Sequence, residues 1–262
     1  MTAATVPARH ATPMTLHPVR LARLVQIELR KATDTRAGRW LLLVVAAIAI
    51  ATAAITAFAG KEKGHSLQNV LANTTSLSTL LLPVLGVLLV TSEWSQRTAL
   101  TTFTLVPRRG RIVAAKTLAG ALLAVLATIV CVLVAVAATA VTSHPDGPNP
   151  GTWHHAVAVV IGSLVVQVLY VLLGIGFGLL FLNTPFAIVV YFALPTAWSI
   201  LTGSVKALDS VGKWANPSTA WEHLTDESVG GTLWLKAAVA AAIWVVVPLV
   251  AGTVRVLRRP IG

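Results

Sequence analysis

Charged residues are scarce in this sequence. Asp, Glu, Lys and Arg make up 11% of its 262 residues, whereas they make up about a quarter of an average soluble domain. Hydrophobic residues account for 56%, and the mean hydropathy is +0.80. A soluble fold cannot cover that much apolar surface. The scarcity of charge therefore excludes a water-soluble globular protein and predicts that lipid covers part of the chain.

Cysteine and acidic residues are also few. The single cysteine, Cys131, lies inside an apolar run, which excludes a disulfide framework and favours a small buried hydrophobic residue. Nine acidic residues against twenty Lys and Arg leave a formal net charge of +11. In a membrane protein such an excess indicates basic cytoplasmic loops rather than a nucleic-acid partner, so we expect no nucleic acid.

Long apolar runs are abundant instead. A membrane-spanning helix needs about 20 mostly apolar residues, and we predict six such spans in a single all-α transmembrane domain at 16–262. They cover residues 40–59, 70–90, 112–141, 153–182, 185–201 and 233–254. Pro195 predicts a kink or an early end in the fifth span. The N-terminal arm, 1–15, has no apolar core and is expected to be disordered.

Six spans place both ends of the chain on one side of the membrane. That side receives fifteen of the twenty Lys and Arg and three of the nine acidic residues, a formal charge of +12 against −1 on the other side. Because basic loops stay in the cytoplasm, we predict a multi-pass protein of the cell membrane with both termini cytoplasmic. No ionisable side chain occupies the centre of a span, so an ion-coupled carrier is not expected.

The stretch VRLARLVQIELRK, 19–31, predicts an amphipathic interfacial helix, which we place at 18–35. Leu21, Leu24, Val25 and Leu29 share one face at about 100° per residue. Glu28 falls in the middle of this apolar face, where a bare carboxylate is costly. Two interpretations stay open: Glu28 has a basic or backbone partner, or the helix tilts and the carboxylate reaches water.

The stretch GRIVAAKT, 110–117, differs by one letter from a phosphate-binding loop, which needs Gly, four residues and then Gly-Lys-Ser/Thr. Ala115 replaces the second glycine and puts a Cβ where the phosphates would approach. No strand precedes the stretch and a predicted span follows it, so we expect neither a nucleotide site nor a catalytic site on this chain. We interpret its basic residues as an anchor on anionic headgroups. The anchor consists of Arg108, Arg109, Arg111 and Lys116.

Three histidines lie in the stretch HPDGPNPGTWHH, 144–155, on the predicted outer side. His144, His154 and His155 could hold a metal ion, but we interpret them as interfacial histidines and expect no metal site. Elsewhere no Ser-His-Asp arrangement and no His-x-x-x-His spacing can be argued.

The connection between the second and third spans, SEWSQRTALTTFTLVPRRGR at 92–111, is unusually apolar for a plain connector. Pro107 ends any helix in it. A short helix from Arg97 to Thr104 would place Leu100 and Phe103 one turn apart on the same side. Threonine is a mediocre helix former, so we expect a partner protein to stabilise this segment.

Taken together, these features resemble the membrane subunit of ABC-2 type ABC exporters, of the kind common in actinobacteria. The resemblance is carried by ELRKATDTRAGRW (28–40), SEWSQRTALTTFTLVPRRGRIVAAK (92–116), six spans and the outer segment WANPSTAWEHLT (214–225). It implies a type V exporter-like architecture and a permease that forms the substrate path. It also implies ATP and Mg on a separate ATP-binding subunit, and a second permease, either another copy of this chain or a homologue.

The resemblance also assigns roles to particular residues. Glu28, Arg30 and Lys31 would lie in a connecting helix. A coupling helix that docks on the ATP-binding subunit would contain or adjoin Glu93, Arg97, Thr98, Leu100, Thr101 and Phe103.

Several residues of the spans are candidates for packing or for the substrate path. Gly174 and Gly178 in GIGFG allow close helix approach, either within one subunit or at a dimer interface. Gln167, Tyr170 and the Ser/Thr-rich first half of the second span are candidates for a mildly polar path that suits an amphiphile. The outer segment 204–231, with two tryptophans, is expected to lie in the interface as a cap over the exit.

The alternative function is a membrane scaffold or facilitator that works without an ATPase. The neighbouring coding sequence discriminates between the two functions. An ATP-binding-cassette subunit encoded next to this chain would favour the exporter.

Overall fold

The computed structural model of the chain describes residues 19–59, 67–96, 98, 108–142, 156–225 and 230–259. Throughout these ranges the regular structure is helical, and they contain no strand. The long helices are α1 (Leu21–Asp34), α2 (Arg36–Ala59), α3 (Leu67–Ser95), α5 (Arg109–Thr142), α6 (Ala156–Phe181) and α7 (Thr184–Ser204). The shorter ones are η2 (Lys206–Leu208), α8 (Asp209–Ala215), α9 (Pro217–Glu222), η3 (His223–Thr225), α10 (Gly231–Ala241), the π-helix η4 (Ala242–Val246) and α11 (Val247–Arg258).

Within these ranges, six helical stretches are long and apolar enough to cross a membrane: α2, α3, α5, α6, α7 and the continuous run α10–η4–α11. Each overlaps one of the six predicted spans, so the prediction of an all-helical fold with six apolar spans is confirmed for the described residues. These lengths and compositions support a multi-pass membrane protein. The fifth span does not end early at its proline, because α7 continues past Pro195 to Ser204.

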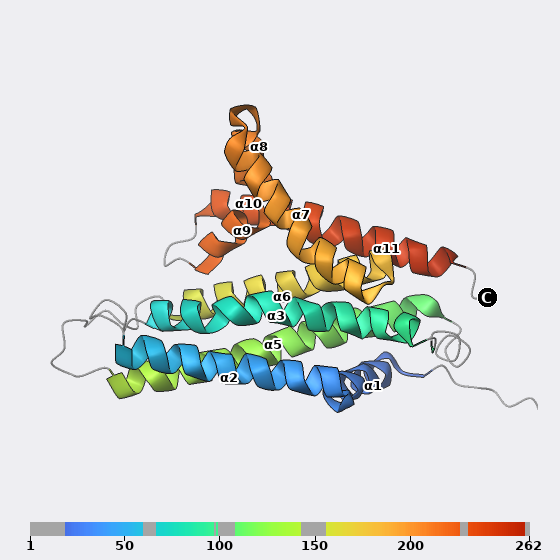
Figure 1. The fold of residues 1–262 in the computed structure, drawn as a ribbon, viewed down its shortest axis with the longest axis horizontal. Helices are drawn as coiled ribbons and strands as arrows, with labels where there is room; N and C mark the ends of the chain where they lie inside the picture. The colour runs from blue at the N-terminus through green and yellow to red at the C-terminus, as the bar shows by residue number, and fades with distance from the viewer. Residues whose placement is uncertain are drawn as a thin grey trace, which may run out of the picture.

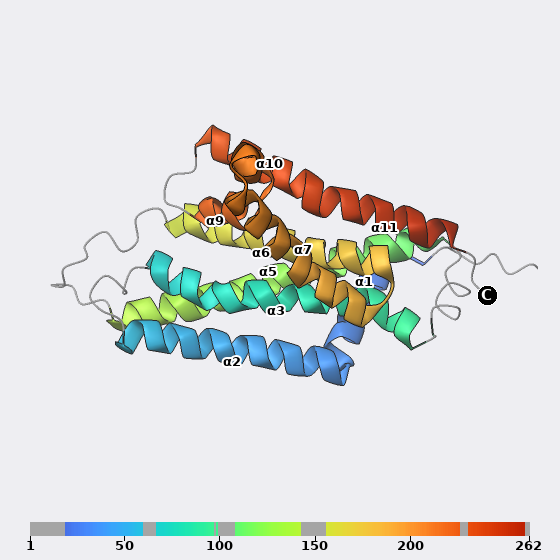
Figure 2. The ribbon, with the colours of Figure 1, turned by 45° about the horizontal axis from the view of Figure 1, so that its top comes forward.

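The second span, α3, lies among the other helices. α2, α3, α5 and α6 run alongside one another, while α7 leaves them at an angle and carries α8 at its far end (Figures 1 and 2). More than half of the apolar window of α3 is buried, a larger share than in the other five spans. Its Thr74 and Ser78 are buried, and their hydroxyls donate to the carbonyl oxygens of Val70 and Thr75. These two hydroxyls of the polar half of α3 are thus kept away from lipid, whereas Asn73 and Ser76 are exposed.

Close packing of α6 on α3 depends on the glycines of α6. A Cβ on Gly174 would overlap the carbonyl oxygen of Pro83, and a Cβ on Gly178 would lie 3.3 Å from the Cα of Val87. Both glycines therefore face α3 of the same chain. Of the two alternatives left open by the sequence, the structure shows packing within one subunit.

A proline in α3 is compensated by a side chain from α7. Pro83 has no N–H, so the carbonyl of Thr79 one turn earlier has no helical donor. The hydroxyl of Tyr191 donates to this carbonyl oxygen over 3.4 Å. This bond links α7 to α3 at a point where the helix alone would leave a buried acceptor unsatisfied.

The outer segment folds into short helices. α8, α9 and η3 pack against α7, α10 and α6. Trp221 is fully buried, its Nε1 donates to the carbonyl oxygen of Ala237 over 3.2 Å, and its ring meets Tyr170 edge-on at a centroid distance of 4.9 Å. Trp214 stays partly exposed beneath the ammonium of Lys236. The prediction that the tryptophans anchor this segment in the interface is corrected for Trp221, whose ring fills the protein core.

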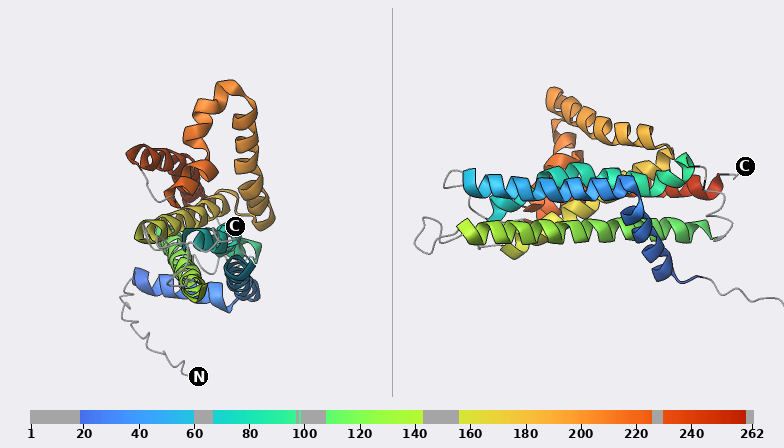
Figure 3. Two further views of the ribbon diagram at one scale, coloured as in Figure 1. Left: turned by 90° about the vertical axis from the view of Figure 1, so that its left-hand side faces the viewer. Right: turned by 60° about the horizontal axis from the view of Figure 1, so that its bottom comes forward.

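The end of α3, the start of α5, the end of α11 and the whole of α1 gather at one end of the bundle, which we call the α1 end (Figures 1 and 3). α1 crosses this end at an angle to α2 (Figure 3). The guanidinium of Arg109 donates to the carbonyl oxygens of Val256 and Arg259 over 3.2 and 2.6 Å. Arg259 in turn lies 5.0 Å above the ring of Trp94. These contacts join the end of α11 to α5 and α3.

Candidate functional site

Four charged side chains meet at the α1 end. Glu28 and Lys31 come from α1, Glu93 from α3 and Lys116 from α5. Lys116 Nζ lies 2.7 Å from Glu28 Oε2 and 3.1 Å from Glu93 Oε1. Lys31 Nζ lies 3.0 Å from Glu28 Oε1 and 2.8 Å from Glu93 Oε1. Each carboxylate therefore contacts both ammonium groups, and we call the four residues the ion cluster.

Small residues on α5 let α1 come close enough to form the ion cluster. Leu24 and Val25 of α1 pack against Ala115 and Ala119 of α5. Glu28 follows these two apolar residues by one turn of α1, so it faces the same surface. Lys116 directly follows Ala115 on that surface and also donates to the carbonyl oxygen of Leu89 over 2.8 Å. The packing of apolar side chains thus fixes the geometry of the charged ones.

The structure decides between the two interpretations of Glu28. Its side chain is 6% exposed and bonds to two ammonium groups. Glu28 therefore has basic partners and does not reach water through a tilt of the helix. Pairing is what makes a buried carboxylate tolerable in apolar surroundings.

Lys116 is buried, whereas a headgroup anchor has to be exposed at the membrane surface. Its side chain is 5% exposed, and its ammonium is held by Glu28, Glu93 and a backbone carbonyl. A group so enclosed cannot contact lipid headgroups, which corrects the prediction for this residue. The physical reason is that two buried carboxylates attract the ammonium more strongly than the exposed interface does.

The other members of the predicted anchor differ among themselves. Arg108 is exposed and Arg111 is half-buried, so the headgroup anchor stays a prediction for these two residues. Arg109 is half-buried and caps the end of α11, as described above. Its main role in the structure is therefore to bind backbone carbonyls at a helix C-terminus.

Lys31 is the accessible member of the ion cluster, with a side chain that is 44% exposed. Burial lowers the pKa of Lys31, but the hydrogen bond to Glu93 and the charges of both glutamates raise it by more, so the net shift is upward from the ordinary value. The ammonium therefore stays charged at neutral pH. The formal charges of the two glutamates and the two lysines sum to zero.

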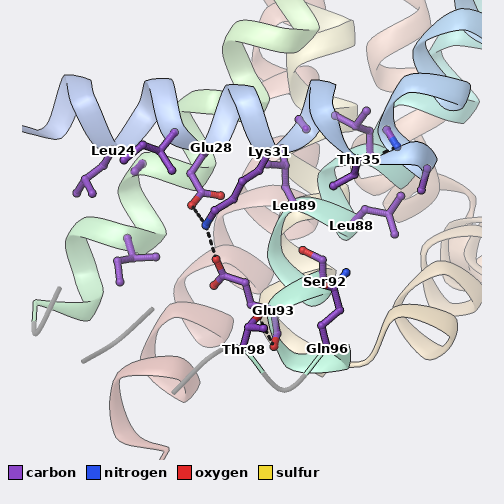
Figure 4. A pocket seen from close by; sticks show the side chains of 17 residues that line it. Leu24, Glu28, Lys31, Thr35, Leu88, Leu89, Ser92, Glu93, Gln96 and Thr98 are labelled. Atoms are coloured by element: carbon purple, nitrogen blue, oxygen red, sulfur yellow. Dashed lines mark hydrogen bonds and ion pairs between the residues drawn. The ribbon is translucent and has the colours of Figure 1, made fainter. Parts of the chain in front are cut away.

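A cavity of about 600 Å³ opens beside the ion cluster, and we call it the α1 cavity. Its walls come from α1, the start of α2, the second half of α3 and the start of α5. Figure 4 shows Glu28, Lys31 and Glu93 on one side of it, with Leu88 and Leu89 from α3 nearby. This volume is in the range of small-molecule and cofactor sites, roughly 300–1,000 Å³.

Part of the predicted coupling segment lies outside the described residues. That part contains Arg97, Leu100, Thr101 and Phe103. The three histidines considered for a metal site also lie outside the described residues: His144, His154 and His155. Within the described part, the backbone N–H of Thr98 donates to the carbonyl oxygen of Glu93 over 2.9 Å. Arg30 of the predicted connecting helix is exposed and lies outside the ion cluster.

The stretch that resembles a phosphate-binding loop is helical throughout. Gly110 to Thr117 all lie in α5, and the hydroxyl of Thr117 donates to the carbonyl oxygen of Val113 over 3.0 Å. A phosphate cradle needs backbone N–H groups that are free to point at the ligand, whereas N–H groups beyond the first turn of a helix are bonded to carbonyls. Among the described residues, no group of three or more His, Cys, Asp or Glu is placed to hold a metal ion.

Gln167 and Tyr170, two of the candidates for a polar path, lie within packed interfaces. Gln167 is almost completely buried, accepts from the hydroxyls of Ser78 and Thr79 over 3.4 and 3.2 Å, and donates to the carbonyl oxygen of Ser78 over 3.3 Å. Tyr170 packs on Trp221. In this chain Gln167 therefore joins α6 to the polar half of α3 and does not face an open space.

Sequence reasoning assigned the members of the ion cluster to three separate roles and missed that they meet. The signal was present, because Glu28 and Lys116 both stand in apolar surroundings and a charge in such a place needs an opposite one. Neither a comparison with protein-family models nor a comparison with curated proteins gave a match to the chain.

Proposed function

We propose that the chain is the membrane permease subunit of an ATP-driven ABC exporter of the cell membrane, with ATP and Mg on a separate ATP-binding subunit. The proposal rests on the resemblance described above, on six apolar helices, and on the arrangement of the α1 end. A second permease, either another copy or a homologue, would complete the substrate path.

The observation that carries the proposal is the ion pair between Lys31 and Glu93, at 2.8 Å. α1 covers the residues that the resemblance assigns to a connecting helix, and Glu93 is one of the residues that it assigns to the coupling helix or its surroundings. Lys116 extends the same contact to α5, where the third span begins. A movement of the coupling segment would therefore reach three helices through one cluster, which suits a subunit driven from outside.

The coupling segment is tested by truncating Phe103. We expect Phe103→Ala to weaken the association with the proposed ATP-binding subunit, or to uncouple its ATP hydrolysis. The loss of a buried aromatic side chain at an interface costs roughly 2–4 kcal/mol when it is a hot spot. Co-purification of the two subunits and substrate-stimulated ATP hydrolysis in liposomes are the measurements.

Arg108→Gln is the matched control, because Arg108 is exposed and lies at the other end of the same connection. It should leave association unchanged. Arg109 is unsuitable as a control, since its guanidinium holds the end of α11. If Phe103→Ala keeps full association and full stimulation, the segment is a plain connector and the proposal loses its coupling site.

The predicted orientation is tested by cysteine labelling. The charge asymmetry predicts that a cysteine at position 108 and one added at the C-terminus react only from the cytoplasmic side. Cys131 is buried against Ser78 and Thr74, so a Cys131→Ser background removes the native thiol with little change in shape. Labelling of either cysteine by an impermeant reagent added to intact cells would contradict the predicted orientation.

A further inference from the structure

The α1 cavity changes from apolar to polar along α3. Leu85, Leu88 and Leu89 line it towards the middle of the span, and Ser92, Glu93 and Gln96 line it towards the end. α1 contributes the same two kinds of surface. An amphiphile with a hydrocarbon chain towards the middle of the span and a polar group towards its end would match both parts of this lining.

The length of the gradient matches one leaflet of a bilayer. With a rise of about 1.5 Å per residue, the stretch from Leu85 to Glu93 covers about 12 Å. The hydrocarbon half of a leaflet is about 15 Å deep, half of the roughly 30 Å core. The polar end of the cavity lies where α2 and α5 begin and α3 ends, which is the level expected of headgroups. The depth of the cavity therefore matches the headgroup and the upper part of one acyl chain of a lipid in one leaflet.

The charges at the polar end select among headgroups. Glu28, Glu93 and the partly exposed Lys31 line the cavity, and the formal charges of these three residues and Lys116 sum to zero. An anionic headgroup would meet the two carboxylates that line the cavity, and a purely cationic one would meet the ammonium of Lys31. A headgroup that carries both an ammonium and a phosphate can place each beside the opposite charge.

We propose that the α1 cavity binds one zwitterionic aminophospholipid from the leaflet at the α1 end. Its acyl chain lies against Leu85, Leu88 and Ile27, its ammonium faces Glu93, and its phosphate faces the exposed side of Lys31. The inference rests on the six spans and not on the ATP-binding partner, so binding to this chain alone tests it separately from the proposed function.

The experiment uses native mass spectrometry of the full chain purified in detergent and titrated with phosphatidylethanolamine or phosphatidylglycerol of the same acyl chains. We expect one phosphatidylethanolamine per chain to be retained, with phosphatidylglycerol bound about tenfold more weakly. Leu88→Trp fills the cavity from α3 and should weaken the retained binding by about tenfold or more. Ile27→Trp fills it from α1, at a residue that is 41% exposed, and tests the same site with less strain on the fold.

Leu126→Trp is the matched control, because Leu126 is 55% exposed on α5 and does not line the cavity. It should bind phosphatidylethanolamine like the unchanged chain. Two results would overturn the proposal: unchanged binding in both folded cavity variants, or phosphatidylglycerol bound as tightly as phosphatidylethanolamine. The first result would show that the lipid lies on the outer surface, and the second that the ion cluster does not select the headgroup.

Discussion

Replacing Lys116 by methionine is expected to destabilise the folded chain by about 3 kcal/mol, at the lower end of the range for breaking a buried ion pair. The change removes one of two ammonium groups that face Glu28 and Glu93, and it leaves two buried carboxylates with a single counter-charge. It also removes the donor to Leu89. We expect the lower end because the ammonium of Lys31 still pairs with both carboxylates. The measurement is the midpoint of unfolding of the purified chain in one detergent.

Lys31→Met is the matched control for this change. Lys31 contacts the same two carboxylates, but its side chain is 44% exposed, so water replaces much of what is lost. Its effect should stay within about 1 kcal/mol. The double change Glu28→Met with Lys116→Met leaves one carboxylate and one ammonium, and it should recover most of the stability, because replacing a whole buried pair is often neutral. Equal effects of the two single lysine changes would show that burial does not set the strength of these contacts.

Replacing Gly174 by alanine is expected to cost about 1–3 kcal/mol of stability, the usual effect of overpacking a core. The new Cβ would overlap the carbonyl oxygen of Pro83, which is backbone and cannot rotate away. α6 must therefore move off α3, which loosens the largest contact between spans. The midpoint of unfolding in detergent measures this loss of stability. Faster hydrogen exchange of the Gln167 side-chain amide, which donates to Ser78 of α3, would show that the loss arises between α6 and α3.

Two other glycines serve as controls for this experiment. Gly178→Ala should cost less, since its Cβ would lie 3.3 Å from the nearest atoms of Val87 and only a small shift is needed. Gly203 lies near the end of α7 with open space around its Cβ position. Gly203→Ala should therefore be neutral or stabilise the chain by up to about 1 kcal/mol, through helix propensity alone. A loss of stability at Gly203 as large as at Gly174 would contradict the packing argument.

The sequence was sufficient for the spans because each needs only a long apolar run, and α2, α5 and α6 contain one. It was also sufficient to mark Glu28 as a residue that needs a partner. It did not identify that partner, because Glu28 and Lys116 are 88 positions apart and pairing across that separation depends on how α1 crosses α5. Trp221 was misplaced for a related reason. An aromatic residue in an outer segment can lie at the interface or in the core, and only the packing of α6 and α10 decides which.

The separation between Glu28 and Lys116 also orders the steps of biosynthesis. α1 leaves the ribosome first, whereas Lys116 follows 88 residues later, at the start of the third span. Until that span is made, the carboxylate of Glu28 has no buried ammonium to meet, and burying it alone would be costly. α1 must therefore wait in water or at the membrane surface, with its basic residues against the headgroups. Its docking is then a late event that follows the insertion of three spans, and it closes the α1 end of the bundle.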